Sequence, residues 1–256
     1  YNEVTDVRND NNLILPKPKM HVHVVTVPAS PALLKIADEC IKMCNDKDGS
    51  YFGIPPKSDS GRDQPWALLA TNISTKAAIN VKLVDPLLDD GDGGKIRYVT
   101  DNVKKIYDKF NAQKGTQMIF CDLGVPSADK VYDVYNDIIN RLVNDYGIPR
   151  EEIVDIHVAD TDIKKAALFK KMNDGDVRIL IAGSKNGGTG VNVQKRMVAI
   201  HHVDMSWNPA NVTQENGRGA RQGNEVAKNY NDNKIEIFYY ATEHSLDLYK
   251  YQLVSS

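Results

Sequence analysis

From about residue 95 onward, apolar residues follow two alternating patterns. Helical spacing, with apolar side chains every three or four residues, runs over 96–110, 131–146 and 161–172. Between and after these segments lie short apolar runs, at 117–121, 153–158, 177–182, 198–203 and 235–240. Strands that are apolar throughout and alternate with helices are typical of a parallel sheet covered on both faces. We therefore predict an α/β fold with a mostly parallel sheet flanked by helices.

The first 94 residues are less regular. Residues 21–27 alternate like a strand, and Ser30-Pro31 is a plausible start for a helix that continues to Cys44. A polar loop over 45–62 separates this helix from a second helical stretch over 66–84. The Gly/Asp-rich run 89–94 is the clearest internal boundary. We expect a lead-in over 1–94, partly packed on a larger lobe over 95–256.

The amino-acid composition excludes few classes of protein. The chain is 41% hydrophobic and 26% charged with a net charge of −2, which is ordinary for a soluble domain. Three cysteines without a framework pattern indicate a reducing, intracellular compartment, either a bacterial or phage-infected cytoplasm or a nucleus. No apolar run reaches membrane-spanning length and no signal peptide is visible, so no membrane partner is expected. Because the chain begins with Tyr1, we expect an excised fragment.

Charge is distributed unevenly along the chain. Residues 163–196 contain eight Lys and Arg against two Asp, which favours a nucleic-acid partner but is also typical of a solvated face. A glycine-rich loop, Gly187-Gly188-Thr189-Gly190, directly follows the predicted strand over 177–182. In parallel sheets ligands lie at the carboxyl ends of the strands, where this loop and the one after Val203 are expected. Exposed backbone amides in such a loop suit phosphates, although the glycines alone are equally consistent with a tight turn.

A second candidate lies in the segment after Pro209. Gln214, Arg218 and Arg221 are four and seven residues apart, so a continuous helix would place them on one face. Two guanidinium groups on one face indicate an anionic partner, and phosphoryl transfer is a chemistry that uses them. The alternative is a solvated basic helix end. Gly217 and Gly219 weaken the helix, which favours a close approach at this point.

Taken together, these segments resemble the second motor lobe of superfamily-two helicases, and among them most closely the Swi/Snf-type DNA translocases. Residues 184–193 resemble the family's motif V, and Trp207-Asn208-Pro209 resembles its Trp-Asn-Pro. Residues 214–223 resemble motif VI, and 117–121 are similar to motif IV. The resemblance covers the chain strongly from about residue 96 and weakly before it. It implies a three-layer RecA-like domain preceded by a helical lead-in.

The resemblance also implies roles for individual residues. Arg221 would be an arginine finger and Arg218 a γ-phosphate contact. Further nucleotide-binding positions would be Gln214, Gly190 and Asn192. Contacts with a DNA backbone, without base specificity, would come from Ser184, Lys185, Gly187, Gly188 and Trp207. The family's usual His before the second arginine is Ala220 here, and its usual Gln after the last glycine is Asn224.

The other half of a motor is missing from the sequence. There is neither a Walker A lysine motif nor an Asp-Glu-x-His motif. ATP and magnesium would then be held mainly by an N-terminal RecA-like lobe upstream, and the fragment alone is predicted to be inactive. The alternative is a degenerate helicase-like lobe that only binds DNA or protein.

Other polar residues are assigned no chemistry. His21, His23, His201 and His202 could supply nitrogen ligands, but Cys40 and Cys44 lack paired Cys-x-x-Cys spacing, so no metal site is expected. Asp160 and Asp162 are predicted to be helix caps rather than catalytic acids.

Overall fold

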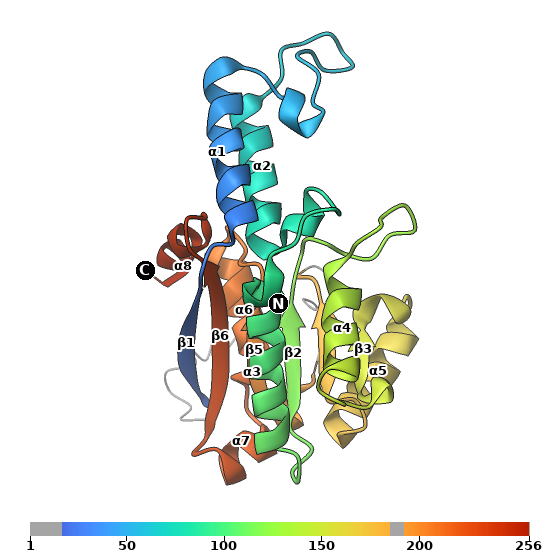
Figure 1. Cartoon of the computed structure of the whole chain (residues 1–256). Coiled ribbons are helices and arrows are strands. Elements are labelled where there is room, and N and C mark those ends of the chain that lie inside the picture. Colours follow the sequence, from blue (N-terminus) through green and yellow to red (C-terminus); the bar gives the residue numbers. More distant parts are fainter. Residues whose placement is uncertain (1–16, 185–191, 256) are drawn as a thin grey trace, which may run out of the picture.

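The computed structural model describes residues 17–184 and 192–255 (Figure 1). Its centre is a six-stranded sheet with the strand order β1-β6-β5-β2-β4-β3, and all the strand pairs within it are parallel. The strands are β1 Lys19–Val27, β2 Thr116–Phe120, β3 Ile153–Asp155, β4 Ile179–Ala182, β5 Met197–His202 and β6 Lys234–Thr242. The predicted α/β class and the parallel sheet are confirmed.

Helices cover both faces of the sheet. They are α1 Pro31–Asp46, α2 Trp66–Ile79, α3 Lys95–Lys109, α4 Val134–Asn144, α5 Asp162–Asp174, α6 Pro209–Gly219, α7 Glu225–Tyr230 and α8 Asp247–Ser255. Successive side chains of a strand point to opposite faces. Thus Ile119 of β2 packs with α3 and α4, whereas Met118 and Phe120 pack with α5 and α6. Three layers result, with helices on both sides of one sheet.

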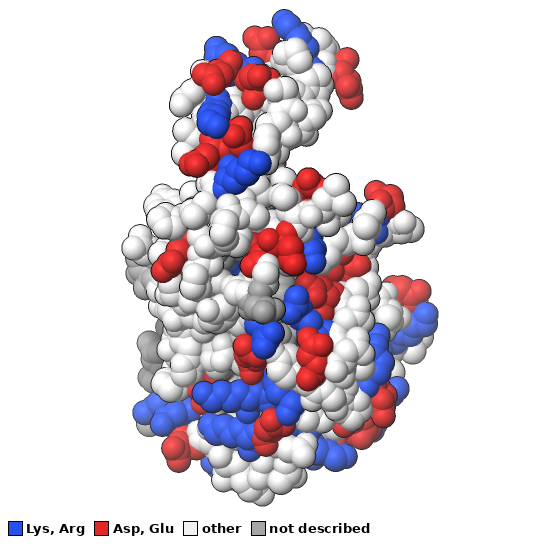
Figure 2. Space-filling model, viewed as in Figure 1, with Lys and Arg blue, Asp and Glu red and all other residues white. Residues whose placement is uncertain are grey.

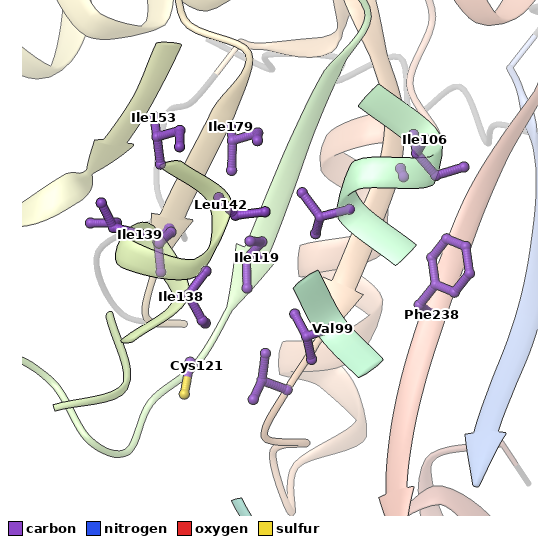
Figure 3. Close-up of a cluster of buried hydrophobic side chains, with 14 of the residues drawn as sticks. Val99, Ile106, Ile119, Cys121, Ile138, Ile139, Leu142, Ile153, Ile179 and Phe238 are labelled. Atoms are coloured by element: carbon purple, nitrogen blue, oxygen red, sulfur yellow. The ribbon is translucent and has the colours of Figure 1, made fainter. Parts of the chain in front are cut away.

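The largest of the three hydrophobic clusters among the described residues lies under α3 and α4. Figure 3 shows Val99 and Ile106 of α3 and Leu142 of α4 gathered over Ile119 and Ile179 of the sheet. All these side chains are 5% exposed or less. Their helical spacing is the pattern from which both helices were predicted, so burial explains the periodicity.

The lead-in is divided between the sheet and a projecting helical pair. β1 pairs with β6 along its whole length, with Lys19 opposite Lys234 and Val27 opposite Thr242. After β1, the hydroxyl of Ser30 accepts a hydrogen bond from Leu33 N and Pro31 occupies the first turn, which confirms the predicted helix start. Helices α1 and α2, with residues 47–65 between them, form an arm beyond the carboxyl ends of the strands (Figure 1). The division at residue 94 therefore leaves one strand of the lobe's sheet in the lead-in.

Three local predictions differ from the structure. The strand predicted over 153–158 ends at Asp155, because its carboxylate accepts a hydrogen bond from His157 N and turns the chain. The helix predicted over 66–84 ends at Ile79. The prediction that Asp160 and Asp162 cap α5 is wrong: Thr161 is the N-cap and accepts from Lys164 N. Of the two acids, Asp160 pairs with the Lys164 ammonium at 2.8 Å and Asp162 lies in the first turn.

Among the described residues, no helix combines the length and the apolarity needed to cross a membrane.

Candidate nucleotide and nucleic-acid interface

The carboxyl end of the sheet holds the start of the segment that resembles motif V. β4 ends at Ala182, and the Asp122 carboxylate, just past β2, accepts hydrogen bonds from both Ser184 N and Ser184 Oγ at 2.6 Å. A Cβ atom on Gly183 would lie 2.9 Å from Asp122 Oδ1, so this close approach requires glycine. Asp122 was not predicted as a site residue, although an acidic residue directly after an apolar strand was a usable signal. Lys185, Gly187, Gly188 and Gly190 lie outside the described residues.

Trp207 lies at the same end of the sheet. Asn208 caps α6 by accepting from Ala210 N at 3.0 Å, and Pro209 occupies the first turn. This cap leaves the Trp207 side chain 47% exposed, with the ammonium of Lys250 5.0 Å from its ring centroid. The Trp-Asn-Pro sequence is thus the start of a helix that presents an indole at the surface.

A hollow of about 570 Å³ opens beside Trp207. It is lined by the arm's α2 and by residues at the carboxyl end of the sheet, including Asp122, Asp204, Trp207 and Lys250. Burial raises the pKa of Asp204 to about 6, although the ammonium groups of Lys250 and Lys95 pull it down. The Lys250 ammonium lies 3.4 Å from the Asp204 carboxylate. The floor of this hollow therefore carries a buried charge pair.

A second buried ion pair lies at the same carboxyl end of the sheet. The Lys95 ammonium lies 2.6 Å from the Asp247 carboxylate, with the two side chains 1% and 5% exposed. Asp247 also accepts from the backbone N–H of Thr242, the last residue of β6. The pair thus joins the start of α3, the end of β6 and the start of α8.

The two arginines of the segment that resembles motif VI lie at the other end of the sheet. Helix α6 runs back along the strands and ends at Gly219, beside Met197 and Ile235 at the starts of β5 and β6. Arg221 follows the helix and is exposed, and its Nη1 donates to Asn192 Oδ1 at 2.7 Å. The structure therefore brings together Arg221 and Asn192, and separates them from Ser184 and Trp207.

The predicted single helical face of Gln214, Arg218 and Arg221 is wrong. Gln214 is exposed on α6, Arg218 is buried at 7% exposure, and Arg221 lies beyond the helix. The reason is the contact made by Gly219, where a Cβ atom would lie 2.8 Å from Met197 Cγ and 2.9 Å from Ile235 Cδ1. The glycine allows close approach, as predicted, but the approach is to the sheet.

The Arg218 guanidinium lies in an unusual environment. Burial lowers its pKa, the nearby Arg221 lowers it further, and Glu215 opposes both effects. Within the described part of the chain, its Nε has no hydrogen-bond partner. A buried donor without an acceptor is costly, and an anionic group at this site would relieve that cost. Together with the exposed Arg221, this donor set fits a phosphate group.

Asn224 has a structural role. It is 3% exposed, and its side-chain amide donates to Met197 O at 2.6 Å and Gly219 O at 3.3 Å. Its Oδ1 accepts from Ala227 N and so caps α7. The departure from the family's usual Gln is thus explained by packing at the end of α6.

The four histidines considered as nitrogen ligands, out of six in the chain, fall into two groups. His201 and His202 are fully buried on β5. The ring nitrogens of His201 contact Gln117 and Tyr240. Burial lowers the pKa of His201 to about 3, and His202 and His23 have smaller effects in the same direction. His21 and His23 instead lie near Glu236 on β6. Cys40 and Cys44 lie apart from both groups, on α1.

Residues 100–223 match the family described as the helicase conserved C-terminal domain. This segment, a little under half of the chain, is similar to the C-terminal domain of helicases. The lobe's fold is similar to the C-terminal part of the Fun30 ATPase domain, with a TM-score of 0.57 and 16% identity over 93% of this chain and 90% of that one. It is also similar to the Hef helicase domain of Pyrococcus furiosus, with a TM-score of 0.53 and 11% identity over 94% of this chain and 59% of that one. The predicted RecA-like architecture is confirmed.

One curated relative matches a shorter part of the chain. Defense against restriction protein B of Escherichia phage P1 is 34% identical over 77 residues, which are 30% of this chain. The matched segment spans only 3% of that protein's length.

The surface of the helicase lobe is not evenly charged. On the face shown in Figure 2, Lys and Arg side chains gather at the end of the lobe farthest from the arm. This is the end at which the strands begin. The basic surface therefore lies at the same end of the sheet as the starts of β5 and β6.

Proposed function

We propose that this lobe is the second half of an ATP-dependent DNA translocase of the Swi/Snf type. In this proposal an N-terminal RecA-like lobe holds most of the nucleotide, and the present lobe completes the site. The observation that carries the proposal is the exposed Arg221 guanidinium, held in place by the Asn192 amide at 2.7 Å. A guanidinium fixed by a neutral partner keeps its charge available for a phosphate.

On the nucleotide side, Arg221 makes the direct contact as the arginine finger, and Arg218 supports it. Bound ATP and magnesium supply the reacting phosphate and its counter-charge. Arg218 is buried and its Nε has no hydrogen-bond partner among the described residues, so lobe closure that brings an anion to this surface would stabilise it. Asn192 positions Arg221, and Gln214, exposed one turn before Arg218, belongs to this side by resemblance. Gly190 belongs to this side by resemblance.

On the DNA side, the proposal assigns backbone contacts to the opposite end of the sheet. Ser184 is fixed there by the Asp122 carboxylate, and Trp207 is exposed beside the hollow next to α2. Lys185, Gly187 and Gly188 follow Ser184 in the sequence and would contact phosphates of the DNA backbone. Binding would be salt-dependent and without base specificity, because phosphate contacts carry no sequence information.

The test uses the intact two-lobed protein. Arg221→Ala should lower DNA-stimulated ATP hydrolysis by about 10³-fold or more, the usual value of an arginine finger. DNA binding should change little, because Arg221 lies at the opposite end of the sheet from Ser184 and Trp207. Arg62→Ala, which removes an exposed arginine of the arm loop, is the matched control. Unchanged turnover in Arg221→Ala would remove Arg221 from this role.

The isolated 256-residue chain offers a second test. Without a partner lobe it should hydrolyse no ATP above background. Turnover that Arg221→Ala abolishes in this chain alone would contradict the split site. If the full protein hydrolyses no ATP with DNA present, the alternative of a degenerate binding module is favoured instead.

A further inference from the structure

Three side chains that are distant in the sequence meet at the β1 edge of the sheet. His21 and His23 are two residues apart on β1, and Glu236 of β6 is the residue directly opposite His21. The nearest atoms are His21 Nδ1 and His23 Nε2, each 2.7 Å from Glu236 Oε2. Because residues two apart on a strand share a face, pairing with β6 places all three side chains on one side of the sheet.

The ring of His23 is held in its position by packing. It stacks on Phe238, with a centroid separation of 4.6 Å and an interplanar angle of 15°. Phe238 in turn stacks on the buried His201 of β5 at 4.7 Å and 4°. The strand order β1-β6-β5 places Phe238 between the two histidine rings. The Nε2 atom of His23 is therefore directed at Glu236 by the sheet itself.

Two imidazole nitrogens and one carboxylate oxygen form a donor set that zinc accepts, with a fourth position left for water. The three ligand atoms lie within 4.8 Å of one another. In a tetrahedral zinc site with bonds of about 2.0–2.1 Å, ligand atoms lie about 3.3 Å apart. The contacts of 2.7 Å would therefore need to open by only about 0.6 Å to admit the ion.

The surroundings of Glu236 leave one of its oxygens available. Oε1 accepts from the Asn231 amide at 3.3 Å and lies 3.8 Å from the Lys109 ammonium, whereas Oε2 faces both histidines. The His21 side chain is 58% exposed, so the cluster opens to solvent on that side.

We propose that His21, His23 and Glu236 bind a zinc-class divalent cation that clamps β1 to β6. Each imidazole offers a lone pair at the nitrogen that faces Glu236. The proton now on that nitrogen moves to the other ring nitrogen or, from a charged ring, to solvent. No other bond changes. The ion would fasten β1, the edge strand of the sheet, to β6, on the face of β6 opposite to Ile235 and its contact with Gly219.

The experiment is a titration of the tag-free 256-residue chain with Co²⁺ and with Zn²⁺. Co²⁺ should give one equivalent of visible d–d absorption of a nitrogen- and oxygen-ligated site, which Zn²⁺ displaces. His21→Gln and His23→Gln should each weaken binding by at least about tenfold. The control is His244→Asn, which removes an exposed histidine whose φ of 57° Asn tolerates, and it should bind as the wild type does.

A second readout distinguishes this site from adventitious binding. Zn²⁺ should raise the thermal midpoint of the wild type and of His244→Asn by mass action, but not that of the two β1 variants. Circular dichroism without metal confirms that each variant is folded. Binding that survives His23→Gln, or no saturable binding below about 1 mM, would overturn the proposal.

Discussion

The two ends of the parallel sheet are held together by different interactions. At the carboxyl end, buried ammonium groups meet carboxylates, as in Lys95–Asp247 and Lys250–Asp204. At the amino end, the close packing of Gly219 fixes α6, and Arg221 is bound by an amide oxygen rather than an acid. The Lys95 and Lys250 ammonium groups are thus paired with carboxylates inside the protein, whereas the Arg221 guanidinium is bound by a neutral group and remains available to an anion. The amino end is therefore the end of the lobe that can offer arginines to a phosphate.

The largest stability effect is expected from breaking a charge pair at the carboxyl end. Lys95→Met leaves the Asp247 carboxylate buried without its ammonium and should lower the free energy of unfolding by about 3–5 kcal/mol. Lys104→Met removes the ammonium of the Lys104–Asp108 pair on the surface of α3, so it should cost no more than about 1 kcal/mol. Urea denaturation measures both. Equal losses would mean that burial of the pair does not determine its contribution.

The second effect concerns pH at the same end. The folded-state pKa of Asp204 is raised from 3.8 to about 6, so the folded protein holds this proton more tightly than the unfolded chain does. The resulting stability is present below pH 4 and is lost as the pH rises through 6. Relative to Asp204→Asn, the wild type should lose about 2–3 kcal/mol between pH 4 and pH 7.

Denaturant titrations of both proteins across this range provide the measurement. The comparison cancels the other titrating groups. A constant difference between the two proteins would show that Asp204 is solvated in the folded state.

The smallest effect tests packing at the amino end. Gly219→Ala places a methyl group 2.8 Å from Met197 Cγ and should cost about 1–3 kcal/mol. Gly217→Ala on the same helix meets nothing within 4 Å and should stabilise the protein by up to about 1 kcal/mol. Opposite signs in thermal denaturation would support the assigned role of Gly219. If both substitutions stabilise the protein, the close approach at Gly219 is not limiting.

The sequence was sufficient where local pattern determines structure. The apolar spacing over 96–110 and 131–146 predicted α3 and α4, because each helix buries one face on the sheet. The Ser30-Pro31 pair predicted the start of α1, because capping depends on residues within one turn. The apolar runs predicted the strands because both of their faces are covered.

Long-range contacts account for what the sequence could not predict. Helical spacing placed Arg221 on the face of Gln214, but the contact of Gly219 with β5 and β6 ends the helix first. Asp204 directly follows a strand, where loop residues are usually exposed. Its carboxylate is nevertheless buried, because Lys250 of α8 packs against it. Glu236 lies more than 200 residues from His21 and His23, so no local spacing could have brought the three together.

The pairing of β1 with β6 has a consequence for the order of events during biosynthesis. Residues 19–27 leave the ribosome first, but their hydrogen-bonding partner at 234–242 follows 215 residues later. At about 5–20 residues per second, this delay lasts roughly 10–40 s. Meanwhile an edge strand carrying Met20, Val22 and Val24, which are 41–53% exposed even in the finished fold, lacks its neighbour. Slow translation or truncation before β6 should therefore favour intermolecular strand pairing and aggregation of the nascent chain.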